Sequence, residues 1–366
     1  MKRPRYVWAL APLVACALVT AFDGCTIVNG LRVPEDAGLD VATVDAGSDA
    51  DASGCVGARP PPPPPPGPPS GSGLFVSVLR DFNFGLRTDG LNPSLGFNLD
   101  GVCTCPAPGS CVAKTVTCDD DQGRDYSAWR LITRAKDATY DLEKTLNDQV
   151  TTGGPSILVF VQDYNGMADD PEVTVAALAS PGLFDAAGTT KLTPTFTASD
   201  AWSVSDTQVV VYQGTTLPKP SSLVRGYVKD RTLVAETPLT LRFNTNVRMV
   251  LSQALIVAKI TEVDGGGFAL GEGTVAGRWP TRDAIESLGS IAIAGTPICD
   301  TPALLDEVRA TICGAADLSA DPAAAGDRPC DAVSAAMTMR GVPASLGPPR
   351  TVVDTVTCSD AGLECP

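Results

Sequence analysis

Two acidic clusters hold the side chains of this sequence that are best placed to do chemistry. The first lies between two apolar stretches and contains Asp163, Asn165, Asp169 and Asp170 around Gly166. Carboxylate and amide oxygens that a glycine turn brings together are the hard ligands that Ca²⁺ prefers. We therefore predict a calcium site at this loop, with those four side chains as ligands. The alternative is an ordinary polar loop, because turns favour the same residue types.

The second cluster runs from Asp119 to Asp125, directly before a helical pattern. As an EF-hand loop starting at Asp119, it would need a glutamate at its last position, where the chain has Arg130. We interpret the cluster as a turn whose negative charge favours the start of a helix. A glycosidase-type pair of carboxylates would fit the first cluster, but spacing alone does not favour it.

Several common chemistries are excluded by the residues that the sequence lacks. The chain of 366 residues contains no histidine, which removes Ser-His-Asp and Cys-His catalysis and His-ligated zinc. No GxSxG, SxxK or Gly-Lys sequence occurs, so the usual serine nucleophiles and the P-loop are absent. The net charge of −15 disfavours nucleic acid as a partner. We predict no catalytic and no cofactor-binding residue, and a binding protein rather than an enzyme.

One glycine motif needs its structural context. Gly271 to Ala276 matches the dinucleotide pattern GxGxxA, but it falls in the second strand of a predicted hairpin and no helix follows it. We interpret its glycines as strand positions that another backbone approaches closely.

The chain has 12 cysteines, and most of them are predicted to form disulfides, as exported proteins do. A four-cysteine zinc site is the alternative for the first four, although their spacing is not a repeated CxxC. A small ring between Cys358 and Cys365 is one possible pairing, and Cys55 is either free or paired with the tail. The predicted disulfide cysteines are Cys103, Cys105, Cys111, Cys118, Cys299, Cys313, Cys330, Cys358 and Cys365.

The N-terminus has the pattern of a bacterial lipoprotein signal. Basic residues precede an apolar run from Tyr6 to Phe22, which is short for a membrane span of about 20 residues. Cleavage before Cys25 uses the whole run and leaves an even number of cysteines downstream. We predict a signal peptide over 1–24 and lipid on Cys25, with Cys16 as the alternative.

Residues 25–73 are predicted to be a linker between the lipid and the folded domain. An Asp/Ala/Gly-rich stretch is followed by seven prolines, Pro60 to Pro66, and a Gly/Ser end. Such prolines form a stiff polyproline II rod of about 22 Å, and the Gly/Ser end would let the domain swivel.

Residues 74–366 are predicted to fold as one mainly β domain, an antiparallel β-sandwich with a few edge helices, stapled by disulfides. The run from Ile157 to Val161 is continuously apolar, which is typical of a strand covered on both faces. Glycines 265–267 predict a hairpin. The predicted strands are Leu74–Leu79, Ile157–Gln162, Val173–Ala179, Gln208–Gln213, Leu239–Phe243, Arg248–Ser252 and Leu255–Glu262. The predicted helices run from Ala128 to Val150, from Thr281 to Gly289 and from Thr301 to Ile312.

The layout resembles that of uncharacterised exported lipoproteins of myxobacteria. The stretches that carry the resemblance are Asp45–Asp51, Asp121–Asp125, Tyr164–Asp170, Gly277-Arg278, Cys313–Asp317 and Cys330–Ser334. The resemblance implies a lipid-tethered, cysteine-rich β domain but no activity, so no functional residue is transferred. Asp23, two residues before Cys25, departs from the usual pattern around the lipidated cysteine.

These observations together favour an outer-membrane lipoprotein, on the periplasmic or the surface face. The membrane is its expected partner through the lipid, and the β domain is expected to bind a glycan or an envelope protein or to be purely structural. Calcium is the one expected cofactor. The alternative function is a secreted, carboxylate-dependent hydrolase of polysaccharide.

Overall fold

The computed structural model describes residues 58–66, 71–87, 93–105, 108–137, 141–243, 247–293, 296–324, 326–352, 358 and 362–366. The predicted signal peptide, both candidate lipidation sites (Cys16 and Cys25), Cys55 and most of the linker lie outside these residues.

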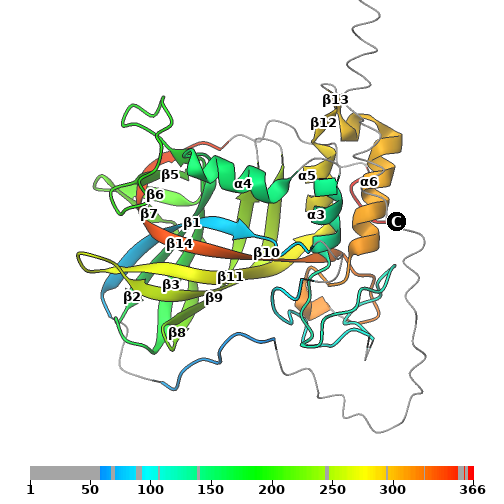
Figure 1. Ribbon diagram of the computed structural model, residues 1–366, viewed down its shortest axis with the longest axis horizontal. Helices are drawn as coiled ribbons and strands as arrows, with labels where there is room; N and C mark the ends of the chain where they lie inside the picture. Colours follow the sequence, from blue (N-terminus) through cyan, green and yellow to red (C-terminus); the bar gives the residue numbers. More distant parts are fainter. Residues whose placement is uncertain are drawn as a thin grey trace, which may run out of the picture.

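The main sheet closes on itself into a barrel of eight strands (Figure 1). Neighbouring strands are antiparallel, and the barrel closes because β14 pairs with β11 on one side and with β1 on the other. The strands are, in order around the barrel, β1 (Gly73–Asn83), β2 (Ser156–Tyr164), β3 (Asp170–Ser180), β8 (Val224–Lys229), β9 (Thr232–Arg242), β10 (Arg248–Glu262), β11 (Phe268–Pro280) and β14 (Ala332–Arg350). The mainly β prediction is confirmed, but the sandwich is wrong: closure removes the free edges that two separate sheets would keep.

Apolar side chains fill the barrel because they alternate along each strand. On β9 and β10, Leu233 lies opposite Ala258 and Ala235 lies opposite Ile256, and all four are buried. Gly273 of β11 lies opposite Ala258, and a Cβ atom at Gly273 would come within 2.6 Å of the Ala258 Cβ. The close approach predicted for this glycine motif is therefore confirmed.

A second layer covers part of the outer wall. Helix α4 (Leu142–Thr151) packs on β1, where the Asn147 side chain bonds both the N–H (2.8 Å) and the C=O (2.7 Å) of Phe82. A small sheet adds β4 (Gly182–Leu183) and β5 (Ala201–Ser205) to the last residues of β14. Trp202 of β5 is fully buried, and so is the run Ile157–Val161, as predicted for a strand covered on both faces.

The predicted helix from Ala128 to Val150 is two helices. α3 spans Ala128–Asp137, and α4 starts anew at Leu142, after Asp141, whose carboxylate accepts a bond from the Lys144 N–H at 2.9 Å. A side-chain cap of this kind satisfies the free N–H groups of a new first turn. The predicted helices at Thr281 and Thr301 are confirmed as α5 (Thr281–Gly289) and α6 (Pro302–Ala315). None of the helices in the described ranges is both long and apolar enough to cross a membrane.

Two strands differ from their sequence patterns. The predicted strands Arg248–Ser252 and Leu255–Glu262 are the single strand β10, interrupted by a bulge at Gln253, which has a φ of 49°. β14 was not predicted at all.

The short elements outside the barrel are β6 (Val209–Tyr212), β7 (Thr215–Pro218), β12 (Ala292–Ile293), β13 (Thr296–Pro297) and the 3₁₀ turns Pro220–Ser222, Ile298–Asp300 and Pro322–Ala324.

Disulfides join loops, α6 and the C-terminal segment to one another beside the barrel. The pairs are Cys105–Cys118, Cys111–Cys330, Cys299–Cys358 and Cys313–Cys365, and Cys103 is also disulfide-bonded. The predicted disulfide cysteines are therefore confirmed as a set. The ring between Cys358 and Cys365 is wrong, because each of them joins a different part of the segment around α6. The zinc alternative is wrong too, because its four sulfurs are all in disulfides.

Candidate functional site

The predicted calcium loop connects β2 to β3, and its oxygens accept hydrogen bonds from the protein. Asp170 is buried and accepts bonds from the N–H groups of Asn165 (2.7 Å) and Glu172 (3.3 Å). Asp163 accepts a bond from the Thr174 hydroxyl at 2.9 Å. These contacts close the loop on itself and shape the turn.

The remaining two predicted ligands are also engaged. The Asp169 carboxylate accepts bonds from Lys229 Nζ (2.8 Å) and the Asp230 N–H (2.9 Å), and these two donors lower its pKa. The Asn165 side-chain oxygen accepts a bond from the Met167 N–H at 2.7 Å. Within the described ranges no group of three or more acidic or cysteine side chains is arranged to hold a metal ion. Calcium binding at this loop stays a prediction.

In the second acidic cluster, Asp120 forms the turn that the sequence indicates. Its carboxylate accepts bonds from the N–H groups of Gln122 (2.9 Å) and Arg124 (3.0 Å) and from the Arg124 guanidinium (2.7 Å). The turn lies between the Cys105–Cys118 disulfide and α3, so it orders the loop that leads into this helix.

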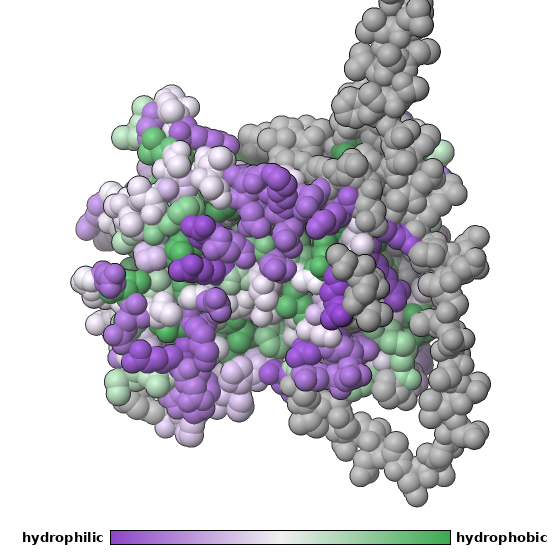
Figure 2. Space-filling model, in the orientation of Figure 1, coloured by the Kyte–Doolittle hydropathy of each residue, from purple (hydrophilic) through white to green (hydrophobic). Residues whose placement is uncertain are grey.

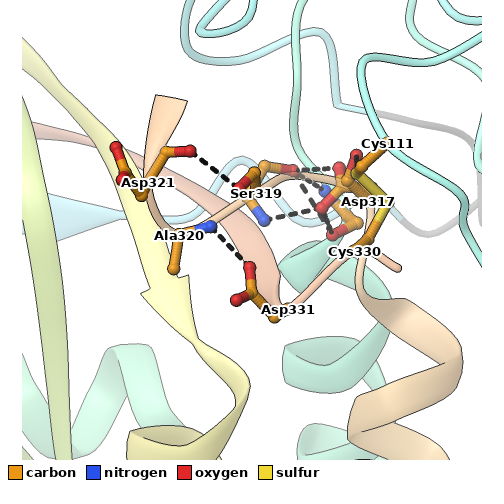
Figure 3. The surroundings of a disulfide bond; sticks show 9 residues. Cys111, Asp317, Ser319, Ala320, Asp321, Cys330 and Asp331 are labelled. Atoms are coloured by element: carbon orange, nitrogen blue, oxygen red, sulfur yellow. Dashed lines mark hydrogen bonds between the residues drawn. A yellow bond between two sulfur atoms is a disulfide. The ribbon is translucent and has the colours of Figure 1, made fainter. Parts of the chain in front are cut away.

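Asp317 is the centre of a buried hydrogen-bond network beside the Cys111–Cys330 disulfide (Figure 3). Its carboxylate accepts bonds from the Ser127 hydroxyl (2.8 Å), the Ser334 hydroxyl (2.5 Å) and the Ser334 N–H (2.8 Å). Burial raises the pKa of Asp317 to about 6, against the lowering effect of these bonds. Both serines are fully buried, so no substrate reaches them and the network is structural.

The charge of Asp317 contributes to raising the pKa of two nearby carboxyls, those of Asp119 and Asp125. Burial, together with the nearby charges of Asp100 and Asp317, raises the pKa of Asp119 to about 7, although a bond from the Thr104 N–H acts to lower it. Burial also raises the pKa of Asp125, and the same neighbours add to the effect. This group of carboxyls makes the region sensitive to pH, because several like charges share a poorly solvated space.

An apolar groove of about 820 Å³ opens where the start of β1, the start of β11 and the end of β14 come together. It forms where β14 leaves β1: Val76 pairs with Ala344, but from Ser345 onward β14 pairs with β5 instead. Leu74 and Leu346 therefore lie on separate walls with open space between them.

Three more elements complete the groove. The β6–β7 hairpin contributes Val211 and Leu217, the tip of the β10–β11 hairpin contributes Phe268, and β2 contributes Phe160. The Phe268 ring also packs against Tyr164, with a centroid distance of 5.0 Å, and this contact anchors the hairpin to β2.

The rim of the groove is apolar and exposed. Leu74 is 57% exposed and Val211 is 55% exposed, and Tyr212 next to Val211 is also exposed. The described residues that line the groove include no charged side chain. Figure 2 shows apolar surface between hydrophilic residues over the barrel. Exposed apolar side chains that gather at one concavity mark a binding site rather than ordinary surface.

The groove does not have the features expected for sugar binding or sugar hydrolysis. Sugars often stack on an exposed tryptophan, but Trp202 and Trp279 are both buried in the core, and the exposed ring of Tyr212 lies beside the groove without lining it. A carboxylate-dependent hydrolase needs two carboxyls facing each other in the cleft, and the described lining contains none.

Sequence reasoning missed the groove because its walls are far apart in the chain. The one sequence feature in this region that stands out is Pro348-Pro349, which follows Ala/Gly-rich sequence and is not typical of a strand. Comparison with known proteins adds no relative: no family model matches the chain, and neither does any curated protein or solved structure.

Proposed function

We propose that this chain is a lipid-anchored protein of the cell envelope whose barrel binds an uncharged acyl chain in the groove and catalyses no reaction. The observation that carries the proposal is the groove itself: about 820 Å³, apolar and uncharged in its described lining, with exposed apolar residues on its rim. This volume lies within the range of about 300–1,000 Å³ that is typical of small-molecule sites.

The chemistry of the lining favours an acyl chain over a glycan or a protein segment. A glycan would bring hydroxyl groups that lose their bonds to water, and the lining offers few polar groups to replace them. A protein segment would bring backbone N–H and C=O groups with the same requirement. An acyl chain has no such groups, and each buried methylene contributes about 0.8 kcal/mol.

The envelope location is supported by the predicted lipoprotein signal and by the disulfides. Disulfides persist in oxidising compartments such as the periplasm and the cell surface. A protein tethered to a membrane would meet acyl chains of lipids and of other lipoproteins at high local concentration.

The test measures binding of the uncharged fluorescent probe N-phenyl-1-naphthylamine to the full chain, with Cys16→Ser and Cys25→Ser so that no attached lipid competes. We expect the probe to bind and an uncharged monoacylglycerol to displace it. Leu74→Asp and Val211→Asp should each weaken probe binding at least tenfold, because a charge in an apolar site loses its hydration.

Val112→Asp is the matched control, because Val112 is 58% exposed, against 57% for Leu74, and does not line the groove. This variant should bind the probe like the parent chain. Equal affinity of all variants, with circular dichroism unchanged, would rule out the groove as the binding site. Displacement by an apolar peptide but not by monoacylglycerol would make the ligand a protein.

A further inference from the structure

The proline-rich end of the linker lies along the barrel instead of projecting from it. The Tyr227 hydroxyl of β8 donates a hydrogen bond to the Pro61 carbonyl. The Asn98 N–H donates one to the Ala58 carbonyl at 2.9 Å, and both Ala58 and Pro64 are buried. In Figure 1 this segment is the blue trace that passes beneath β8. The segment is therefore bound to the domain at several points.

Tyr227 belongs to an apolar stripe on the outside of the barrel. Tyr227 lies directly opposite Val234 of β9, and Val234 lies opposite Val257 of β10. These side chains point outward, because their neighbours Val228, Leu233 and Ile256 fill the interior. Val234 is nevertheless only 4% exposed. An aromatic ring beside aliphatic side chains is a surface on which prolines pack well.

The hydrogen bond to Pro61 follows from the chemistry of polyproline. A run of prolines has no N–H groups, and a polyproline II helix makes no internal hydrogen bonds. Its carbonyls are therefore free acceptors, and a hydroxyl donor on an aromatic residue supplies both the bond and the packing surface. Burial against this segment is consistent with the raised pKa of Tyr227.

We propose that Tyr227, Val234 and Val257 form a binding site for a polyproline II segment, and that the chain's own Pro60–Pro66 fills it. The stiff segment needs little further ordering, so docking loses little conformational entropy. The segment starts at Ala58, which is bonded to Asn98 beside the disulfide-bonded loops. Further along the chain, Gly71 lies against the backbone of Asn165, where a Cβ atom at Gly71 would come within 2.5 Å of the Asn165 Cα. Docking therefore fixes the end of the barrel at which the linker arrives.

The test removes the proline segment from the chain and then supplies it as a free peptide. In the full chain, Pro60–Pro66 is replaced by a Gly/Ser sequence of equal length, and a fluorescent peptide with the sequence of residues 58–66 is added. Fluorescence anisotropy should show binding to this variant, and at least tenfold weaker binding to the unmodified chain, whose site is filled. A peptide that keeps Arg59 but has Gly/Ser in place of the prolines should not bind.

Substitutions in the Gly/Ser variant locate the site. Tyr227→Ala should abolish peptide binding, and Tyr227→Phe should weaken it about fivefold, the loss of one hydrogen bond. Tyr212→Ala is the matched control, because Tyr212 is an exposed tyrosine on β6, and it should have no effect. Absence of peptide binding to the Gly/Ser variant, or equal binding by Tyr227→Ala, would overturn the proposal. None of these measurements depends on the groove.

Discussion

Cys111 and Cys330 form a disulfide although they are 219 residues apart in the sequence. Among the four disulfides whose two cysteines both lie in the described ranges, this one closes the longest segment of chain. The bond joins the loop before α3 to Cys330, two residues before the start of β14. It therefore holds the last barrel strand beside the loop that covers the Asp317 network.

Removal of this disulfide should destabilise the protein more than removal of Cys105–Cys118. A disulfide stabilises mainly by restricting the unfolded chain, so the effect grows with the length of the closed segment. Replacing Cys111 and Cys330 by Ala should lower the free energy of unfolding by about 2–5 kcal/mol. The same change at Cys105 and Cys118, which are 13 residues apart, is the control and should cost less. Urea unfolding measures both, and a reversed order would contradict the entropic explanation.

Stability should fall as the pH rises from about 4 to about 7. The pKa values of Asp119 (about 7), Asp317 (about 6) and Asp125 are raised in the folded protein, so folding favours their protonated forms. Their contribution is fully present below the unfolded pKa of about 3.9 and is lost as the pH passes the folded values. Melting temperatures measured across this range should show the decline.

An Asp119→Asn variant should flatten this pH dependence, because the amide keeps an acceptor for the Thr104 N–H but does not ionise. Asp121→Asn, at an exposed position of the same turn, is the control and should leave the profile unchanged. A profile that Asp119→Asn does not alter would mean that other groups set the pH dependence.

Calcium binding at the β2–β3 loop is tested by melting the protein in millimolar Ca²⁺ and in chelator. Asp163, Asp169 and Asp170 already accept protein hydrogen bonds, so a cation would have to displace these donors. If the predicted site forms, the melting temperature should be higher in Ca²⁺ than in chelator, and equal melting temperatures would rule the site out. Calcium that bound only the folded state at one hundred times its Kd would add about 2.7 kcal/mol. A rise that disappears in Asp169→Ala would establish the site.

Lipidation at Cys25 predicts that a Cys25→Ser variant leaves the membrane fraction, whereas Cys16→Ser stays in it. The apolar run reaches Phe22, so only cleavage before Cys25 removes all of it. Fractionation followed by immunoblotting of the two variants gives the answer. The opposite result would assign the lipid to Cys16.

The elements that the sequence predicts well are those with a strong local pattern. The run Ile157–Val161 marks a strand covered on both faces, and Gly265, Gly266 and Gly267 all have positive φ at the predicted hairpin. The start of α4 was missed because apolar spacing continues across it, while the cap at Asp141 is a single polar residue.

The closure of the barrel and the groove could not be predicted in the same way. β14 contains Pro343, Pro348 and Pro349 and many small residues, so its composition does not resemble that of a strand. Its place is set by partners far away in sequence, Val76 on β1 and Val275 on β11. The groove depends on the residue after which β14 leaves β1, and no local pattern encodes that position.

The dual pairing of β14 also sets the order in which the protein can fold. Val76 of β1 pairs with Ala344 of β14. The first barrel strand therefore cannot complete its pairing until almost the whole domain has been synthesised. Contacts of such long sequence separation form slowly, because a large loop must close first. Until β14 arrives, β1 and β11 each keep an unpaired edge, which is the surface on which foreign strands add. The closing strand therefore does more than complete the barrel, because it is also the element that covers the two edges most open to wrong pairing.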